Sequence, residues 1–365
     1  MRAAPVLILA LVSLGIPRAH ADKFDTSATT TARALGMGNA VINTERGGMS
    51  VFHNPANIAA KDTGSVFQIV NFSLEANEGL VTQSQKGGSI NFANLSTFYE
   101  TMNGNKNNYA GGRYSLYPNL TIRNLSFGVL YERNRAAMVR ETDGAFIVRA
   151  KDRFAPTAAL SFRLFAGIFR IGIMAQYLTV GEADSTIAAP VDKSQLDWNK
   201  VINSRGAITK TGGVTLTLPM RYLPSFSFVA RDIGGTTFNK SPLVPSGTGR
   251  NVEPKKMTYD LATSFTVYLS SRIETRWEVD YRDVLNRNQG NRMRHIFAGT
   301  EMDMFNFLHF RAGYMHGWPA AGLGVGTAKA NINFAWYSDE VEDRLRAFRD
   351  TRYVLQYTHS LFGGK

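Results

Sequence analysis

The stretch Ala32–Ala56 reads A-R-A-L-G-M-G-N-A-V-I-N-T-E-R-G-G-M-S-V-F-H-N-P-A. It is rich in glycine, has little regular spacing of apolar residues, and ends in Asn54-Pro55-Ala56. Pro55 disfavours helical geometry at Asn54, whose side chain can cap a short helical turn that begins at the proline. On local chemistry alone, the stretch is either a surface loop with a turn or an irregular segment attached to a larger structure.

The chain behind this stretch consists of short runs in which apolar and polar residues alternate. Leu125, Phe127, Val129 and Tyr131 fall on one face of such a run, as the two-residue period of a β-strand requires. Counting the runs predicts about fourteen strands of mostly 10–13 residues, with room for a hidden hairpin in the longest. The predicted strands are 64–75, 110–122, 124–134, 137–149, 154–165, 167–181, 208–218, 222–232, 257–269, 271–282, 294–303, 306–316, 322–338 and 352–362.

One face of the run 273–281 carries four consecutive ionisable residues, and the run 308–314 adds a histidine and an arginine. Such a row cannot lie in a dry core without a large desolvation cost, and facing lipid costs roughly 2–4 kcal/mol per charge at mid-depth. It must therefore face water or a paired polar lumen. The expected lumen-lining residues are Glu274, Arg276, Glu278, Asp280, His309 and Arg311.

The fold class that follows is all-β, a transmembrane antiparallel β-barrel of about fourteen strands. Tight connections alternate roughly with long ones such as 182–205 and 236–256, as they do in membrane barrels. The composition agrees, with 33 Gly, 23 Phe, 14 Tyr and only 19% charged residues. Beyond the N-terminus, no apolar run approaches the length of a spanning helix. In the connection 76–109, the spacing of Phe92, Leu95, Phe98 and Tyr99 predicts a short helix.

The N-terminus has the pattern of an export signal. Arg2 precedes an apolar run from Ala3 to Ile16, and Ala19-His20-Ala21 fits the small-residue cleavage pattern. We therefore expect a signal peptide at 1–21, an irregular N-terminal segment at 22–60, and the barrel at 61–365.

Other functions are disfavoured by what the sequence lacks. The net charge is +12, but the basic residues are spread out and form no nucleic-acid-binding patch. There is no cysteine, and the six histidines show no metal-binding spacing, so we expect neither a metal nor a cofactor. Glu274, Glu278 and Asp280 could act as paired catalytic carboxylates. Arg276 among them favours a lumen network instead, and we expect no enzyme.

The glycine-rich stretch resembles the FadL-like outer-membrane barrel superfamily through A-L-G-M-G-N-A at 34–40 and N-P-A at 54–56. Further similarity lies at 230–234, 279–283 and 311–324, where the sequence looks closer to the PorV/UPF0164 branch. The resemblance implies a fourteen-stranded barrel in the bacterial outer membrane with the N-terminal segment as a plug, or hatch. The expected plug and gate residues are Gly36, Gly38, Asn54, Pro55 and Ala56.

Two functions follow from the resemblance. The first is passive uptake of hydrophobic or amphipathic small molecules such as fatty acids, admitted by a shift of the plug or through a lateral gap. The second is a PorV-like scaffold or shuttle that docks exported proteins without transport. The expected partners are outer-membrane lipids and either a hydrophobic small molecule or an exported protein. The heavily charged lumen row and the short mature chain weaken the fatty-acid assignment.

Overall fold

The computed structural model describes residues 30–60, 65–86, 90–244, 247–249, 251–288, 291–340 and 349–362. The predicted signal peptide at 1–21 and the polar residues 22–29 lie outside the described residues. None of the helices in the described residues is long and apolar enough to cross a membrane.

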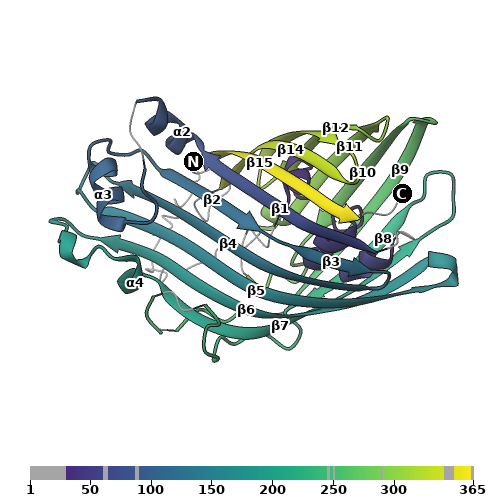
Figure 1. The fold of residues 1–365 in the computed structure, drawn as a ribbon, viewed down its shortest axis with the longest axis horizontal. Helices are drawn as coiled ribbons and strands as arrows, with labels where there is room; N and C mark the ends of the chain where they lie inside the picture. Colours follow the sequence, from purple (N-terminus) through teal and green to yellow (C-terminus); the bar gives the residue numbers. More distant parts are fainter. Residues whose placement is uncertain are drawn as a thin grey trace, which may run out of the picture.

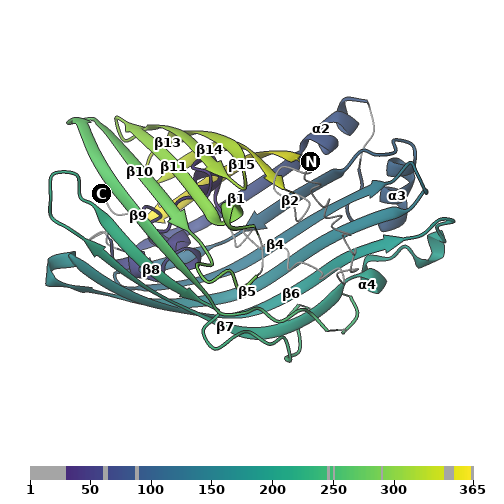
Figure 2. The ribbon, with the colours of Figure 1, turned by 180° about the vertical axis from the view of Figure 1, so that it is seen from behind.

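A single antiparallel sheet closes on itself through pairing of its first and last strands, β1 and β15 (Figures 1 and 2). The strands are β1 (Val66–Asn77), β2 (Ala110–Leu116), β3 (Asn119–Ile122), β4 (Leu125–Val139), β5 (Phe146–Leu164), β6 (Phe169–Ile187), β7 (Asn203–Thr217), β8 (Ser225–Arg231), β9 (Thr258–Ser270), β10 (Ile273–Tyr281), β11 (Ile296–Met304), β12 (Leu308–Met315), β13 (Trp318–Gly326), β14 (Ala330–Glu340) and β15 (Arg349–Phe362). The helices are α1 (Ala32–Gly36), η1 (Gly47–Phe52), η2 (Pro55–Ala60), α2 (Glu78–Gln85), α3 (Leu95–Asn103), η3 (Phe165–Gly167), η4 (Lys193–Gln195), α4 (Trp198–Val201) and η5 (Arg292–His295).

The short strands β2 and β3 together form one interrupted strand. Both lie between β1 and β4 and pair with each of them. The interruption falls at Tyr117-Pro118, where proline cannot donate to the ladder. Counted this way, the barrel has fourteen strands, and the predicted fold class is confirmed.

The predicted bounds of two strands are wrong. The run 137–149 is not a strand of its own, because it spans the end of β4, a turn and the start of β5. The run 322–338 does contain a hairpin, formed by β13 and β14. The errors cancel in the count. The predicted length is also too short for β5 and β6, which have 19 residues each and extend the barrel at the end with the long loops.

The outer face of the barrel is apolar, as a membrane-spanning barrel requires. Alternate side chains such as Phe127, Ile173 and Trp277 are exposed on it, with 46%, 52% and 46% of their surface accessible. Large apolar residues are also exposed at the short turns, including Phe165 and Phe305. At the other end, on the left in Figure 1, α2, α3 and α4 lie beside the ends of the long strands. The predicted helix in 76–109 corresponds to α3, and α2 was not predicted.

Residues Thr30–Ala60, called the inner segment below, cross the space inside the barrel. Its first helix, α1, contacts β12 to β15, and its last, η2, contacts β5 to β7 on the facing wall. From Thr30 to Ala59 every residue is buried except Arg33, Arg46 and Gly47. The alternative of a surface loop is therefore wrong for this part of the chain.

Candidate functional site

The inner segment begins with a helix that touches the wall where both partners lack side chains. Thr31 caps α1 by accepting a hydrogen bond from the Ala34 amide over 2.9 Å. A Cβ atom on Gly36 would lie 2.9 Å from the Cα atom of Gly322 in β13. Gly38 has a φ of +60°, and a Cβ atom there would overlap the backbone of Tyr314. Close backbone approach explains both predicted glycines.

An ionic cluster joins α1 to β10, β11 and β12. At its centre is Glu301 of β11, which is 1% exposed. Its carboxylate accepts hydrogen bonds from Arg33 of the inner segment over 2.7 Å, from Arg276 over 2.9 Å and from Arg311 over 2.8 Å. Arg33 also donates to Glu45 over 3.0 Å. The neighbouring carboxylates raise the pKa of the Arg33 guanidinium despite its burial, so the group stays charged.

Two carboxylates of β10 hold the middle of the inner segment by its backbone. Asp280 accepts from the amides of Val41 and Ile42 over 3.0 and 3.3 Å. Glu278 accepts from the amides of Asn43 and Thr44 over 2.5 and 3.1 Å. An irregular segment cannot satisfy these N–H groups by itself, and a buried unpaired N–H is costly. The row of acids therefore supplies the hydrogen bonds that the segment lacks.

Two arginines of the wall donate hydrogen bonds to backbone carbonyl oxygens of the inner segment. Arg231 of β8 donates to the oxygens of Phe52 and His53 over 2.7 and 2.9 Å, while its Nε pairs with Asp260. Arg282 donates to the oxygen of Asn39. These arginines leave the ring of His53 in a cationic environment. Burial and these cations hold the pKa of His53 well below its usual range, so the ring is neutral.

Asn54-Pro55-Ala56 lies against β5 to β8. The Asn54 amide donates to Thr215 over 2.9 Å and to Ser227 over 3.1 Å, and its Oδ1 accepts from the Ala56 amide over 3.1 Å. This last bond is the cap expected at the start of η2. Ser161 donates to the oxygen of Ala56 over 2.9 Å.

Two glycines of the wall lie directly behind this tripeptide. A Cβ atom on Gly172 would overlap the backbone of Pro55, and one on Gly213 would overlap the side chain of Asn54. A larger residue at Gly172 would displace the inner segment, and one at Gly213 would do so unless the Asn54 side chain is replaced as well.

The predicted lumen residues fall into two groups. Arg276, Glu278, Asp280 and Arg311 join the network around the inner segment, as described above. Glu274 and His309 lie nearby on the same wall, but each pairs within the wall, Glu274 with Arg276 and His309 with Asp303 over 3.4 Å. Neither forms a hydrogen bond or ion pair with the inner segment in the part of the chain that the structure describes.

On the opposite side of the lumen, the inner segment contacts an apolar cluster. Met49, Phe52 and Ile58 of the inner segment pack in one cluster with inward residues of β4 to β7. The ring of Phe52 meets Tyr117 edge-to-face with a centroid distance of 4.9 Å. The wall residues of this cluster include Leu130, Ala155, Ala159, Met174, Leu178, Val180 and Ala207. The inner segment therefore makes ionic contacts with β10 to β12 and apolar contacts with β4 to β7, where the buried ion pair of Arg153 with Glu132 (3.3 Å) shares the inner face with the apolar cluster.

Several important residues were missed from the sequence. The predicted site residues do not include Arg33 and Glu301, which pair with each other and with further charged residues. They also do not include Arg231 and Arg282. Extending the alternating charged row one strand further, through Glu301 and Asp303, would have found the acid. The basic partners at strand ends carry no such signal.

No family model and no curated protein matches this sequence. Solved structures do resemble the fold. The structure titled CymD monoaromatic hydrocarbon channel has a TM-score of 0.52 and 10% identity, with 90% of this chain and 96% of that chain covered. The toluene transporter TbuX of Ralstonia pickettii has a TM-score of 0.51 and 10% identity, with coverages of 91% and 98%. A deltaS2 mutant of the TodX monoaromatic hydrocarbon channel has a TM-score of 0.51 and 9% identity, with coverages of 91% and 97%.

These likenesses cover nearly the whole of each chain and show the fold, a closed fourteen-stranded antiparallel β-barrel preceded by an N-terminal segment. At about 10% identity they do not transfer a substrate.

Proposed function

We propose that this protein is an outer-membrane barrel for passive uptake of hydrophobic or amphipathic small molecules, with the inner segment as the plug of its lumen. The observation that carries the proposal is that the inner segment makes two kinds of contact in the lumen. Strands β10 to β12 hold the segment by ion pairs and hydrogen bonds, and strands β4 to β7 add a buried apolar cluster beside it. An apolar molecule would have favourable contacts with this cluster, beside Phe52 and Tyr117.

The likeness to channels for monoaromatic hydrocarbons supports the same substrate class. In this proposal Gly36, Gly38, Asn54, Pro55 and Ala56 are seat residues of the plug. A shift of η1 and η2 away from β4 to β7 opens a path along the apolar cluster, while the ionic contacts of α1 keep the plug attached. A lateral gap in the wall is the alternative opening.

The direct test is uptake of labelled toluene and of a labelled long-chain fatty acid by cells with and without the gene. Uptake that depends on the gene for at least one compound supports the proposal. Equal uptake across a panel of apolar compounds would remove it.

A second candidate is a scaffold that docks exported proteins without transport. It is favoured by exposed apolar side chains on the long loops, namely Leu243, Val244, Leu285 and Met293. In that case the ionic contacts of the inner segment simply seal the barrel. Cross-linking in intact cells through a photoreactive residue at Leu285 distinguishes the two. A specific protein adduct favours the scaffold, and its absence together with gene-dependent uptake favours the channel.

A further inference from the structure

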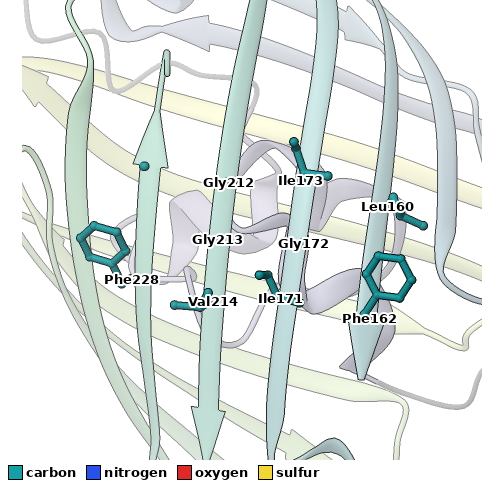
Figure 3. A pocket seen from close by; sticks show the side chains of 10 residues that line it. Leu160, Phe162, Ile171, Gly172, Ile173, Gly212, Gly213, Val214 and Phe228 are labelled. Carbon is teal, nitrogen blue, oxygen red and sulfur yellow. The ribbon is translucent and has the colours of Figure 1, made fainter. Parts of the chain in front are cut away.

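The outer wall of the barrel has an apolar hollow across β5 to β8 (Figure 3). Its volume is about 400 Å³, within the range of roughly 300–1,000 Å³ that small-ligand sites occupy. The side chains around it point away from the lumen, and the inner segment lies behind the strands in Figure 3. The lining residues are Leu160, Phe162, Ile171, Gly172, Ile173, Gly212, Gly213, Val214, Phe228 and Ala230.

The hollow exists because small residues meet on the outer face. Gly212 pairs with Ile173 on one side and with Ala230 on the other. Its outward position carries no side chain, and Ala230 adds only a methyl group. Ile173 and Phe228 stand on either side with about half of their surface exposed. The floor is therefore backbone, and the rim is hydrocarbon.

A lysine lies next to the hollow on the same outer face. Lys210 lies two residues from Gly212 on β7, on the same outer face and roughly 6.5 Å further along the strand. The side chain of Lys210 is exposed, and Ile208 beyond it is an exposed apolar residue of the same face. Among the described residues, Lys210 has no ion-pair partner. A lysine on a lipid-facing wall is costly unless its ammonium group reaches an anion or the interface.

A second lysine extends this positive charge. Lys240, in the connection between β8 and β9, exchanges two backbone hydrogen bonds with Gly206 of β7, over 2.8 and 2.9 Å. Residues opposite each other in such a pair project to the same face, and Gly206 shares the outer face with Lys210. Lys240 is exposed, and it too lacks an ion-pair partner in the part of the chain that the structure describes.

We propose that the hollow and the two lysines form a binding site for a phosphorylated membrane lipid. One acyl chain fills the hollow, and the phosphate lies against Lys210 and Lys240. The apolar lining excludes a polar ligand from the hollow, and the unpaired ammonium groups select an anionic headgroup. The site rests on the barrel standing in a membrane, and it does not depend on what passes through the lumen.

Native mass spectrometry of the purified full-length barrel tests this proposal. Dioleoylphosphatidylglycerol and dioleoylphosphatidylcholine serve as probes, because they share acyl chains and differ in net charge. We expect the anionic lipid to bind more tightly to the wild type. Lys210→Gln combined with Lys240→Gln should weaken binding of the anionic lipid by about fivefold per lysine and weaken the zwitterionic lipid less, because its choline group already offsets the phosphate charge.

Gly212→Leu fills the hollow and should weaken both lipids. The matched control is Ala312→Leu, which adds the same kind of bulk at an exposed position of β12. Equal affinity of wild type and Gly212→Leu would overturn the acyl site. An unchanged preference in the lysine variant would overturn the headgroup site, even if Gly212→Leu failed to fold. Tight binding of palmitate with no binding of phosphatidylglycerol would also contradict the proposal, because it would indicate a site for free acids.

Discussion

The guanidinium group of Arg33 forms a fork with the carboxylate of Glu301, donating from Nε to Oε1 over 3.0 Å and from Nη2 to Oε2 over 2.7 Å. Arg33 belongs to the inner segment and Glu301 to β11, so this fork joins an irregular segment to the barrel wall. Forked pairs of this kind are both strong and geometrically specific. The pair therefore fixes where the inner segment begins its path across the lumen.

Replacement of Glu301 by glutamine should destabilise the protein strongly. The change leaves Arg33, Arg276 and Arg311 together without the carboxylate that they share, and breaking a buried ion pair costs about 3–5 kcal/mol. Urea unfolding in detergent micelles measures the effect as the free energy of unfolding. Glu141→Gln is the control, because Glu141 is exposed and should change the free energy by less than about 0.5 kcal/mol. A loss below about 1 kcal/mol for Glu301→Gln would contradict the structural role.

Removal of the Glu278 carboxylate should leave two backbone N–H groups of the inner segment without their hydrogen-bond acceptor. In Glu278→Met the N–H groups of Asn43 and Thr44 lose their acceptor, and an orphaned buried N–H costs about 1–3 kcal/mol. Hydrogen exchange at these two amides should accelerate by about tenfold or more. The matched control is Glu274→Met on the same face of β10, where the acid pairs with Arg276. If both variants leave exchange at Asn43 and Thr44 unchanged, the hydrogen bonds to Glu278 do not hold the segment.

A methyl group on the inner side of β6 should displace the inner segment. Gly172→Ala places a Cβ atom against the Pro55 backbone, and overpacking of this kind typically costs about 1–3 kcal/mol. We expect faster leakage of a small polar dye from liposomes that contain the variant. Gly212→Ala is the control, because that Cβ atom points outward and its nearest neighbour is the end of Ile233 at 3.3 Å. Equal leakage for the two variants would argue against a seat at Gly172.

Acid should destabilise the packing of the inner segment against the wall, because His53 is buried there as a neutral ring. Because the pKa of His53 is lowered in the folded state, the neutral ring contributes stability above about pH 6.5, the ordinary pKa of histidine. As the pH falls below that value, only the released or unfolded state takes up the proton. Stability should then fall by at most about 1.4 kcal/mol per pH unit, until the pH reaches the lowered pKa.

Comparing wild type with His53→Gln isolates this contribution. The free energy of unfolding, measured from pH 7.5 to 5, should fall more steeply for the wild type. Parallel curves would show that His53 does not titrate with unfolding. A steeper fall for the variant would mean that His53 stabilises the folded state as the pH falls, the opposite of the expected effect.

The fold was predictable from the sequence because two-residue alternation reports directly which side chains face lipid. The row Glu274 to Asp280 identified a polar inner face, since four ionisable side chains could not face hydrocarbon. The strand boundaries were harder to predict from the sequence. At 137–149 the alternation continues through a turn, so the pattern could not separate the end of β4 from the start of β5.

The site was predictable only in part. The glycines and Asn54-Pro55-Ala56 were visible because close backbone approach and capping need particular residues. The pairing of Arg33 with Glu301 was not, because it joins positions 268 residues apart and depends on how the segment crosses the lumen. The apolar cluster was hidden as well. Inward residues such as Ala155 and Leu178 look like any strand residues until the closed barrel places them beside Phe52.

The most direct test of the plug as a gate is a reversible covalent lock. A Cβ atom on Gly213 would lie 3.1 Å from the Cγ atom of Asn54, close enough for a disulfide between cysteines at the two positions. The chain contains no cysteine, so Asn54→Cys with Gly213→Cys can form only this bridge within the chain. Asn54→Cys alone controls for the loss of the Asn54 amide, and the reduced double variant controls for the two substitutions together. The measurement is gene-dependent uptake of labelled toluene or fatty acid by cells carrying the double variant, before and after reduction. We predict that uptake is blocked in the oxidised protein and restored by reductant, whereas equal uptake in the two states would contradict a moving plug.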